Sequence, residues 1–271
     1  MPELPEVETV KNGLKKKIIN KKITNCKVLY DNIIEIPDKI SFINKIKNET
    51  INDIKRRGKF LLFELDNYYL ISHLRMEGKY FIKEINSSLN KHDHVIFELD
   101  NKEELIYNDT RKFGKMYLVK KEELNKSPLS KLGYEPWDKA LTKEYLKEKT
   151  NKNKAIKTLL LDQSIIAGIG NIYADEILFL SKINPETPGK NLTNKNLLDI
   201  IENTKIILEK AISLGGTTIH TYTSVDGVTG RFQQELLVHN KEKQPCPNCQ
   251  TSIIKITVNG RGTYYCQKCQ K

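Results

Sequence analysis

The chain has 271 residues, of which 38% are hydrophobic and 29% charged, so it can bury a sizeable core in two or three compact units. No apolar run is long enough to span a membrane, and the N-terminus lacks the charged-then-apolar pattern of a secretory signal. The 45 lysines and arginines exceed the 34 aspartates and glutamates, which gives a net charge of +11. This charge suggests a polyanionic partner such as nucleic acid, although an AT-rich genome explains the many lysines equally well. We expect a cytoplasmic, nucleoid-associated protein without membrane contact.

The first half of the chain changes from helical to strand periodicity. Apolar residues recur at helical spacing from 5 to 18, and Pro5, Glu6 and Glu8 suit the first turn of a helix. From about 23 to 120 short alternating segments follow, and the string FELDN occurs twice where a hairpin turn is due. The pattern predicts an N-terminal helix followed by a β-sandwich.

The second half is helical up to a cysteine-rich end. Residues 141–149, 154–165, 171–183 and 193–214 carry helical patterns after the Gly/Pro-containing break LGYEPW at 132–137. We expect four segments: a β-sandwich domain (1–132), a linker (133–150), a helical domain (151–240) and a finger (241–271).

Four of the five cysteines form a metal-binding pattern. Their spacing is C-x2-C-x16-C-x2-C, which is typical of a tetrahedral zinc site in a chain without a secretion signal. Between the two pairs, β-branched and aromatic residues flank an Asn259-Gly260 turn, which predicts a hairpin with Arg261 at its tip. A purely structural zinc ribbon explains the cysteines but leaves an arginine between two glycines unexplained. We expect one structural zinc ion, with the ligands Cys246, Cys249, Cys266 and Cys269.

The stretch IIAGIGNIYADEIL predicts two helices joined by a glycine turn. We expect the first helix to stop at Gly168 and the next to start with Asn171 as its N-cap. Glycines beside a helix N-terminus leave N–H groups open to a phosphate, but such turns more often only pack helices together.

Basic residues lie beside exposed apolar candidates in the sandwich. RRGKF contains Lys59, HLRMEG contains Met76, and NDTRKFG contains Arg111 and Phe113. Basic residues position phosphates, and a neighbouring Met or Phe can wedge into a base stack. Periodicity by itself favours core packing for Met76 and Phe113.

The segment MPELPEVETV allows covalent chemistry at the N-terminus. A small second residue favours removal of Met1, which would leave Pro2 with a free secondary amine whose pKa of about 8 is well below that of lysine. Such an amine can attack a sugar C1′ to form an iminium ion, and Glu3 could move the protons that this needs. Helix capping alone explains Pro5, Glu6 and Glu8 but not Pro2 and Glu3.

Taken in chain order, six motifs resemble those of the formamidopyrimidine-DNA glycosylase family. They are PELPEVET (2–9), KHDHV (91–95), DTRKFG (109–114), GIGNIYADE (168–176), LGGTT (214–218) and the four-cysteine finger with Arg261. The resemblance covers the whole chain. It implies a bifunctional bacterial repair enzyme that excises oxidised purines, notably 8-oxoguanine and formamidopyrimidines, from damaged double-stranded DNA and then cleaves the abasic site by β,δ-elimination.

The resemblance also assigns roles to individual residues. It makes Pro2 the Schiff-base nucleophile and Glu3 the proton donor at the sugar. It makes Lys59 the proton donor in β-elimination and Arg261 the proton donor in δ-elimination. Residues 214–232 would cover the flipped base. The DNA contacts would be His92, Arg111, Lys152 and Asn171, and the residues that fill the gap left by the flipped nucleotide would be Met76, Arg111 and Phe113.

The expected fold class is therefore α+β. It comprises an N-terminal helix with a two-sheet β-sandwich, a helix-two-turn-helix domain and a β-hairpin zinc finger, in a monomer without a coiled-coil seam. Arg75 and Glu77 flank Met76 where some family members have small residues, which bears on the choice of opposite base.

The sequence leaves two alternative functions open. The sister branch, endonuclease VIII, shares Pro2 and Glu3 but prefers oxidised pyrimidines, and Leu4 and Met76 favour the purine branch. A non-catalytic DNA-binding zinc protein would need neither a free secondary amine nor its proton donors.

Overall fold

The computed structural model describes residues 1–217 and 230–271, which belong to two compact units. The first unit comprises Met1–Ser130 with Gly215–Gly230, and the second comprises Lys131–Leu214 with Arg231–Lys271. The range 133–150, expected as a linker, lies in the second unit and contains helix α3 (Lys143–Thr150). Within the described ranges, no helix is both long and apolar enough to cross a membrane.

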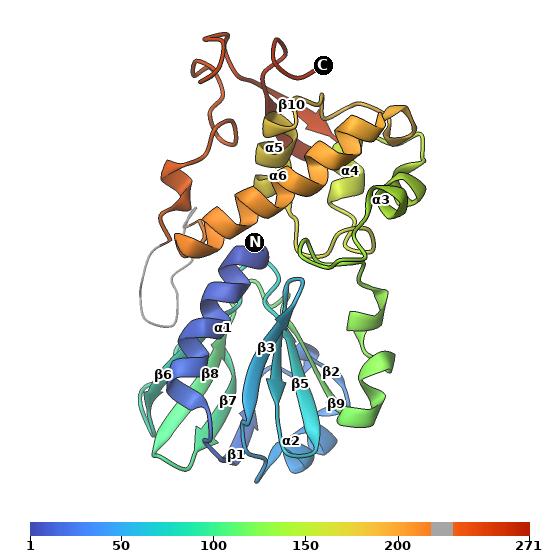
Figure 1. The fold of residues 1–271 in the computed structure, drawn as a ribbon. Helices are drawn as coiled ribbons and strands as arrows, with labels where there is room; N and C mark the ends of the chain where they lie inside the picture. The colour runs from blue at the N-terminus through green and yellow to red at the C-terminus, as the bar shows by residue number, and fades with distance from the viewer. Residues whose placement is uncertain (218–229) are drawn as a thin grey trace. The chain divides into compact units, whose positions relative to one another are not determined.

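The first unit begins with helix α1 (Leu4–Ile18), which runs along the strands in Figure 1. Two sheets follow, with strand orders β1-β7-β8-β6 and β2-β9-β5-β4-β3. All the strand pairs are antiparallel except β2 with β9. The expected N-terminal helix and β-sandwich are confirmed. The strands are β1 (Ile23–Val28), β2 (Ile34–Ile36), β3 (Asp53–Arg57), β4 (Phe60–Glu64), β5 (Tyr68–His73), β6 (Lys79–Glu84), β7 (Asp93–Leu99), β8 (Glu103–Asn108) and β9 (Lys115–Lys120).

The core of the first unit lies between the two sheets and α1. Alternating residues of each strand point inward, so Phe63 of β4 and Phe97 of β7 join one buried cluster. Leu14 of α1 is fully buried in the same cluster. Cys26 lies in β1 as expected, and burial raises the pKa of its thiol to about 12, which keeps it protonated. The alternation of apolar residues along the strands thus supplies the inward face of each sheet.

Short elements between β1 and β3 were not expected. Helix α2 (Lys39–Ile46) begins at the N-cap Asp38, whose carboxylate accepts a hydrogen bond from the Ser41 N–H at 3.0 Å. The remaining short elements of this unit are the 3-10 turns η1 (Asp31–Ile33), η2 (Lys121–Lys126) and η3 (Pro128–Lys131, whose last residue belongs to the second unit).

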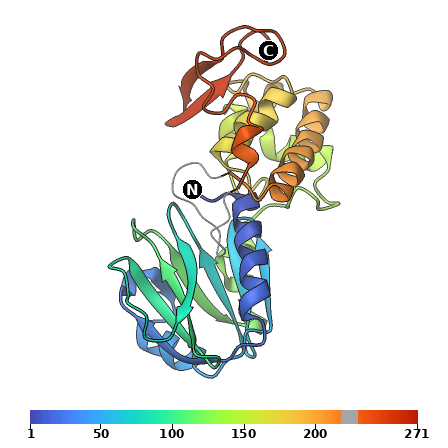
Figure 2. The same ribbon diagram turned by 90° about the vertical axis from the view of Figure 1, so that its left-hand side faces the viewer.

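The second unit combines helices with a small hairpin. Figure 2 shows the hairpin in red at one side of the helices, and β11 contacts α5. The Asn259-Gly260 turn joins β10 to β11, as expected. The elements besides α3 are α4 (Ile156–Leu160), α5 (Asn171–Leu180), η4 (Gly189–Asn191), α6 (Asn194–Ser213), η5 (Phe232–Gln234), β10 (Ile254–Val258) and β11 (Arg261–Tyr265).

Two expected helix boundaries in this unit were wrong. The helix before the glycine turn ends at Leu160 rather than Gly168, because Gln163 holds the following residues in a turn. Its side-chain amide donates to the Ile169 carbonyl at 2.8 Å and accepts from the Gly168 N–H at 2.9 Å. Gly170, not Asn171, is the N-cap of α5, so Asn171 is the first helical residue.

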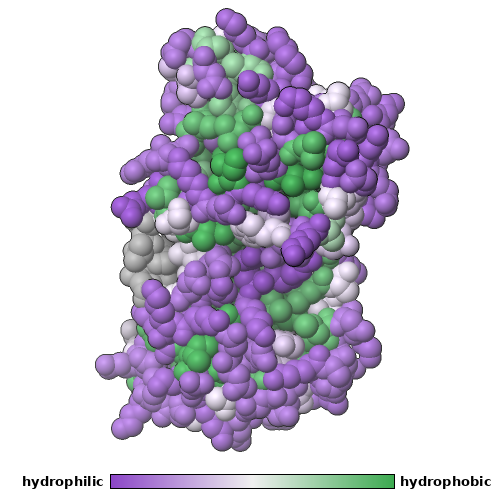
Figure 3. Space-filling view, in the orientation of Figure 1, coloured by the Kyte–Doolittle hydropathy of each residue, from purple (hydrophilic) through white to green (hydrophobic). Residues whose placement is uncertain are grey.

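The face of the molecule drawn in Figure 3 is mainly hydrophilic. Figure 3 shows purple residues over most of the visible face, with smaller green areas between them, and the mean hydropathy of the chain is −0.51. This face, on a chain with a net charge of +11, suits a polar, charged partner better than an apolar one.

Candidate functional site

The N-terminal segment is held by a buried glutamate. Pro2 and Glu3 are buried, and Glu3 is the N-cap of α1, so helix capping accounts for Glu3 as well, contrary to the expectation from the sequence. Glu6 Oε2 accepts from the Glu3 N–H at 2.8 Å, and its Oε1 accepts from the N–H and hydroxyl of Thr217 at 2.7 and 3.1 Å. Glu6 therefore joins Glu3, the residue after Pro2, to Thr217 of the LGGTT motif.

Gly216 allows this close approach to Glu6. A Cβ atom at Gly216 would lie 2.6 Å from Glu6 Oε1, and the residue has a positive φ of +76°. Both constraints favour glycine. The glycine in the motif is thus explained by a turn packed against a carboxylate.

Lys59 lies in the turn between β3 and β4 and is only 5% exposed. The same hairpin is tied to α1, because Arg56 Nε is 2.7 Å from Glu8 Oε2. Burial raises the pKa of Glu8, but hydrogen bonds from Lys11 and Arg56 outweigh it and leave that pKa below its usual value. The ion pair thus anchors the lysine-bearing hairpin to the helix that follows Pro2 and Glu3.

Two turns, each of which leads from one sheet to the other, carry the expected intercalating residues. Met76 lies in the turn after β5 and is half-buried, whereas Phe113 lies in the turn after β8 and is 50% exposed. The Arg111 guanidinium lies 4.8 Å from the centroid of the Phe113 ring. Phe113 is therefore not a core residue, and it forms one exposed pair with Arg111.

The expected DNA contacts His92 and Lys152 lie in different units. His92 is half-buried in the turn before β7, and its N–H donates to Asn90 Oδ1 at 3.0 Å. Lys152 is exposed just before α4. Close to it in sequence, a hollow of about 400 Å³ opens between the start of α4 and the hairpin turn, and it is lined by Lys154, Ala155, Thr158, Val258 and Asn259.

Asn171 is joined directly to the finger. Its Nδ2 donates to the carbonyl oxygen of Gly262 at 3.0 Å. Gly262 follows Arg261, which is exposed at the start of β11 as the hairpin pattern predicts. The structure therefore brings the expected phosphate contact and the finger arginine together.

A buried ion pair supports the same hairpin. Lys157 Nζ is 2.7 Å from Asp175 Oδ1, and both side chains have no exposed surface. The ammonium also donates to the Gly262 carbonyl at 3.0 Å and to Thr263 Oγ1 at 2.8 Å. On its other oxygen, Asp175 lies 2.7 Å from His239 Nδ1. The network joins α4, α5, the segment before the finger and β11.

The neighbouring Glu176 holds that segment by its backbone. Its carboxylate accepts from the N–H groups of Leu237, Val238 and His239 at 2.7, 3.0 and 2.8 Å. Burial raises the pKa of Glu176 although the three hydrogen bonds oppose the shift. The acidic pair in GIGNIYADE thus connects α5 to the chain that leads into the finger.

The four finger cysteines fit one zinc ion. Their sulfur atoms all lie within 4.8 Å of one another, with Cys246 Sγ 3.8 Å from Cys269 Sγ and Cys249 Sγ 3.5 Å from Cys266 Sγ. A tetrahedral ion with Zn–S bonds of about 2.3 Å requires sulfur separations near 3.8 Å. Four sulfur ligands leave no open position, so this zinc is structural.

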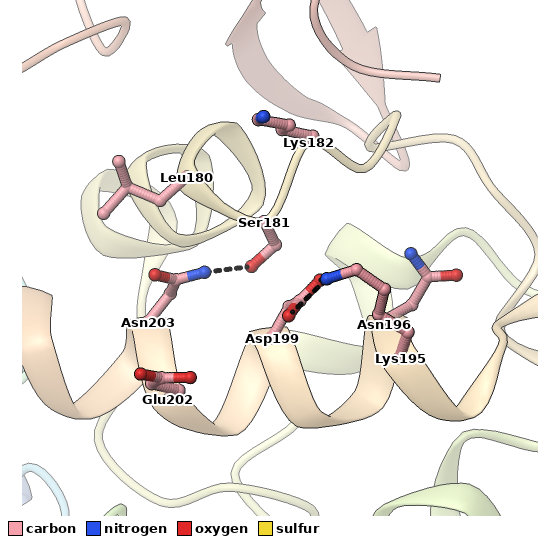
Figure 4. Close-up of a pocket in the computed structure, with 8 residues that line it drawn as sticks. All are labelled: Leu180, Ser181, Lys182, Lys195, Asn196, Asp199, Glu202 and Asn203. Carbon is pink, nitrogen blue, oxygen red and sulfur yellow. Dashed lines mark hydrogen bonds and ion pairs between the residues drawn. The ribbon is translucent and has the colours of Figure 1, made fainter.

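A further hollow of about 460 Å³ lies between the end of α5 and the first half of α6 (Figure 4). Its polar groups pair with one another: Asn203 Nδ2 donates to Ser181 Oγ at 3.1 Å, and Lys195 lies 2.8 Å from Asp199. The lining contains none of the expected site residues.

The structure thus gathers the expected residues in two groups. Pro2, Glu3, Lys59, Met76, His92, Arg111 and Phe113 belong to the first unit, and Lys152, Asn171, Arg261 and the zinc ligands to the second. The expected covering loop, 214–232, falls mostly on residues 218–229, which are outside the described ranges. The sequence patterns did not single out Lys157, Asp175 or His239. Lys157 and Asp175 carry charge within apolar helices, which is a weak local signal, whereas His239 lies in a turn after η5 and carries no such signal.

Three family models cover most of the chain. The formamidopyrimidine-DNA glycosylase N-terminal domain matches residues 1–116, the H2TH domain of the same enzyme matches 132–223, and a zinc finger found in FPG and IleRS matches 243–271. The chain belongs to the formamidopyrimidine-DNA glycosylase family.

Curated proteins and solved structures resemble the chain over its full length. Formamidopyrimidine-DNA glycosylases of Bacillus cereus and Bacillus subtilis are 47% and 46% identical over 273 residues, which cover 100% of this chain and 99% of each relative. A mutant Lactococcus lactis FPG bound to Fapy-dG containing DNA superposes with a TM-score of 0.94 at 40% identity, covering 100% of both chains. The Lactococcus lactis Fpg bound to abasic site containing DNA gives 0.93 at 40% identity, covering 99% of both.

Proposed function

We propose that this protein is a base-excision repair enzyme that removes oxidised purines from duplex DNA and then cleaves the strand. Family membership over the whole length carries this proposal, and the Lactococcus lactis relative bound to Fapy-dG DNA supports a purine substrate. The buried Pro2-Glu3 start, held by Glu6, supplies the groups that the chemistry needs.

The reaction starts at the N-terminal amine. After removal of Met1, the neutral amine of Pro2 attacks C1′ of the damaged nucleoside while the bond from C1′ to the base breaks, and the base leaves with a proton. The product is an iminium ion between Pro2 and the opened sugar. Glu3 protonates the ring oxygen of the deoxyribose as the sugar opens.

Strand cleavage follows from the same intermediate. The iminium ion acidifies C2′, so loss of a C2′ proton expels the 3′-phosphate in β-elimination. A second elimination expels the 5′-phosphate, and hydrolysis releases the proline. We assign proton donation in β-elimination to Lys59 and in δ-elimination to Arg261.

DNA binding uses both units. We propose that His92, Arg111, Lys152 and Asn171 contact the DNA backbone, since basic side chains and helix N-termini position phosphates. Met76, Arg111 and Phe113 fill the space left by the flipped nucleotide. We propose that the enzyme acts as a monomer, in the cytoplasm and at the nucleoid, where its DNA substrate lies.

Zinc keeps the finger folded and takes no part in the reaction. Its four thiolate ligands hold the base of the hairpin whose tip presents Arg261.

Borohydride trapping tests this function. The wild-type chain is incubated with duplexes that carry 8-oxoguanine, thymine glycol or an abasic site, and covalent adducts are counted. We expect efficient trapping with 8-oxoguanine, and loss of most of the adduct in Pro2→Gly or when Met1 is retained. Preference for thymine glycol would favour an endonuclease VIII-like enzyme. The absence of an adduct with every duplex would contradict the proposal that the protein is an enzyme.

A further inference from the structure

Asp109, at the end of β8, organises the turn that carries Arg111 and Phe113. The residue is fully buried, and its Oδ1 accepts from the Arg111 N–H at 2.9 Å. Its Oδ2 accepts from the N–H groups of Phe113 and Gly114 at 3.0 and 2.8 Å. Hydrogen bonds to a buried carboxylate are stronger than neutral ones. One side chain therefore determines the backbone path of this turn.

The backbone of Asp109 also fixes the segment that carries His92. Its N–H donates to the His92 carbonyl at 3.0 Å, and its own carbonyl is 2.9 Å from His94 Nε2. The His92 segment and the Arg111–Phe113 turn are thus joined through one residue.

Tyr107 extends the connection to the turn that carries Met76. The side chain is fully buried, and its hydroxyl lies 3.4 Å from Asp109 Oδ2. A Cβ atom at Gly114 would lie 1.7 Å from this hydroxyl, and one at Gly78 would lie 2.3 Å from it. Gly78 closes the Met76 turn, since its N–H donates to the Leu74 carbonyl at 2.9 Å. The hydroxyl therefore touches the backbone of both turns.

We propose that Tyr107 and Asp109 are a positioning pair that holds the two turns as one rigid wedge. The inference rests on the proposed function, in which Met76, Arg111 and Phe113 occupy the space of a flipped nucleotide. Opening a base stack costs a few kcal/mol. If the backbone of a turn moved in response, its side chains would no longer fill the space of the flipped nucleotide. Glycine at 78 and 114 lets the hydroxyl pack against both backbones, beside the Asp109 carboxylate that holds the second turn.

Tyr107→Phe tests the pair with a small change, and Tyr80→Phe is its matched control. Tyr80 on β6 pairs directly with Tyr107 on β8, is 2% exposed and donates its hydroxyl to Ser72 Oγ at 2.8 Å. Both variants remove one buried hydroxyl from the same sheet. Only Tyr107→Phe removes a hydroxyl that contacts the two turns.

Three measurements separate positioning from general stability. They are single-turnover excision of 8-oxoguanine from a duplex, fluorescence of 2-aminopurine placed opposite the lesion, and cleavage of an abasic site in a single strand, where no stack must be opened. We expect Tyr107→Phe to slow duplex excision about 10-fold and to reduce the fluorescence change, with single-strand cleavage within about 2-fold of wild type. Tyr80→Phe should stay within about 2-fold of wild type in all three.

Asp109→Asn gives a stronger version of the test. The amide keeps the size of the side chain but replaces one acceptor by a donor that faces backbone N–H groups, so we expect about 100-fold slower duplex excision. Equal effects of Tyr107→Phe and Tyr80→Phe, or duplex excision unchanged in Tyr107→Phe, would overturn the inference while leaving the proposed function intact. A wild-type chain that excises no lesion would overturn both.

Discussion

Lys157 Nζ and Asp175 Oδ1 form a 2.7 Å ion pair from which solvent is excluded, between helices α4 and α5. The same ammonium reaches Gly262 and Thr263 of β11, 105 and 106 residues further along the chain. Desolvating two charges is costly, and the remaining hydrogen bonds of the ammonium offset part of that cost. The pair therefore joins the helices to the strand that begins with Arg261.

Lys157→Met should destabilise the second unit by about 3–5 kcal/mol, because Asp175 would be left buried without its cation. Urea unfolding can be followed by the fluorescence of Trp137, the single tryptophan, which lies in this unit. Lys195→Met is the control, since Lys195 pairs with Asp199 on the exposed face of α6 and its loss should cost about 0.5 kcal/mol. Equal unfolding midpoints for the two variants would contradict a structural role for the buried pair.

Chelation of zinc should unfold the finger and loosen residues 182–184. The finger is tied to this segment by the hydrogen bonds from Asn184 N to Lys271 O at 3.0 Å and from Gln270 Nε2 to Ile183 O at 2.9 Å. Metal analysis should find one zinc ion per chain, and hydrogen exchange should show lost protection in both segments after chelation. Cys26→Ala should keep the zinc, whereas Cys246→Ala should lose it. Protection that survives chelation would contradict the account.

Glu6→Gln should slow excision about 10-fold, because an amide cannot accept hydrogen bonds on both of its ends as Glu6 does from Glu3 and Thr217. Single-turnover kinetics on an 8-oxoguanine duplex measure the effect. Glu64→Gln makes the same change of charge at a residue paired with Lys55, outside α1, and should leave the rate unchanged. An unaltered rate in Glu6→Gln would show that Glu6 only caps the helix.

The His73 ring should stay neutral in the folded chain far below pH 6.5. Burial lowers its pKa to about 3, and the nearby charges of Arg75 and Lys59 act in the same direction. Its Nδ1 accepts from the Arg75 N–H at 3.0 Å, so the proton is on Nε2. An NMR titration of labelled histidine should show this tautomer unchanged down to about pH 4.

The sign of the stability effect follows from this lowered pKa. Below pH 6.5 the unfolded chain binds a proton at His73 that the folded chain does not, so stability falls with acidification by up to about 1.4 kcal/mol per pH unit until pH 3. His73→Gln removes this contribution and should flatten the curve of unfolding free energy against pH. Parallel curves for the variant and the wild type would contradict the neutral ring.

Local patterns predicted the elements that depend on local periodicity. The alternating strands, the repeated FELDN turns and the Asn259-Gly260 hairpin follow from neighbouring residues, and the structure confirms them. The end of α4 could not be predicted, because the apolar run continues past Leu160 and the turn depends on side-chain hydrogen bonds from Gln163.

Hydrogen bonds between residues far apart in the chain could not be predicted from the sequence alone. Glu6 bonds to Thr217 across 211 positions, and Lys157 to Thr263 across 106, and no spacing rule connects them. The resemblance identified Pro2, Lys59 and Arg261 as chemical groups, but only the structure shows the buried contacts that support their neighbours.

Peptide mapping of the borohydride-trapped adduct tests the central claim most directly. The wild-type chain is trapped on an abasic or 8-oxoguanine duplex, the DNA and protein are digested, and the modified peptide is identified by mass spectrometry. The account predicts that the sugar remnant is attached to the N-terminal peptide beginning at Pro2, with Met1 absent. An adduct on a lysine such as Lys59, with the Pro2 peptide unmodified, would contradict it.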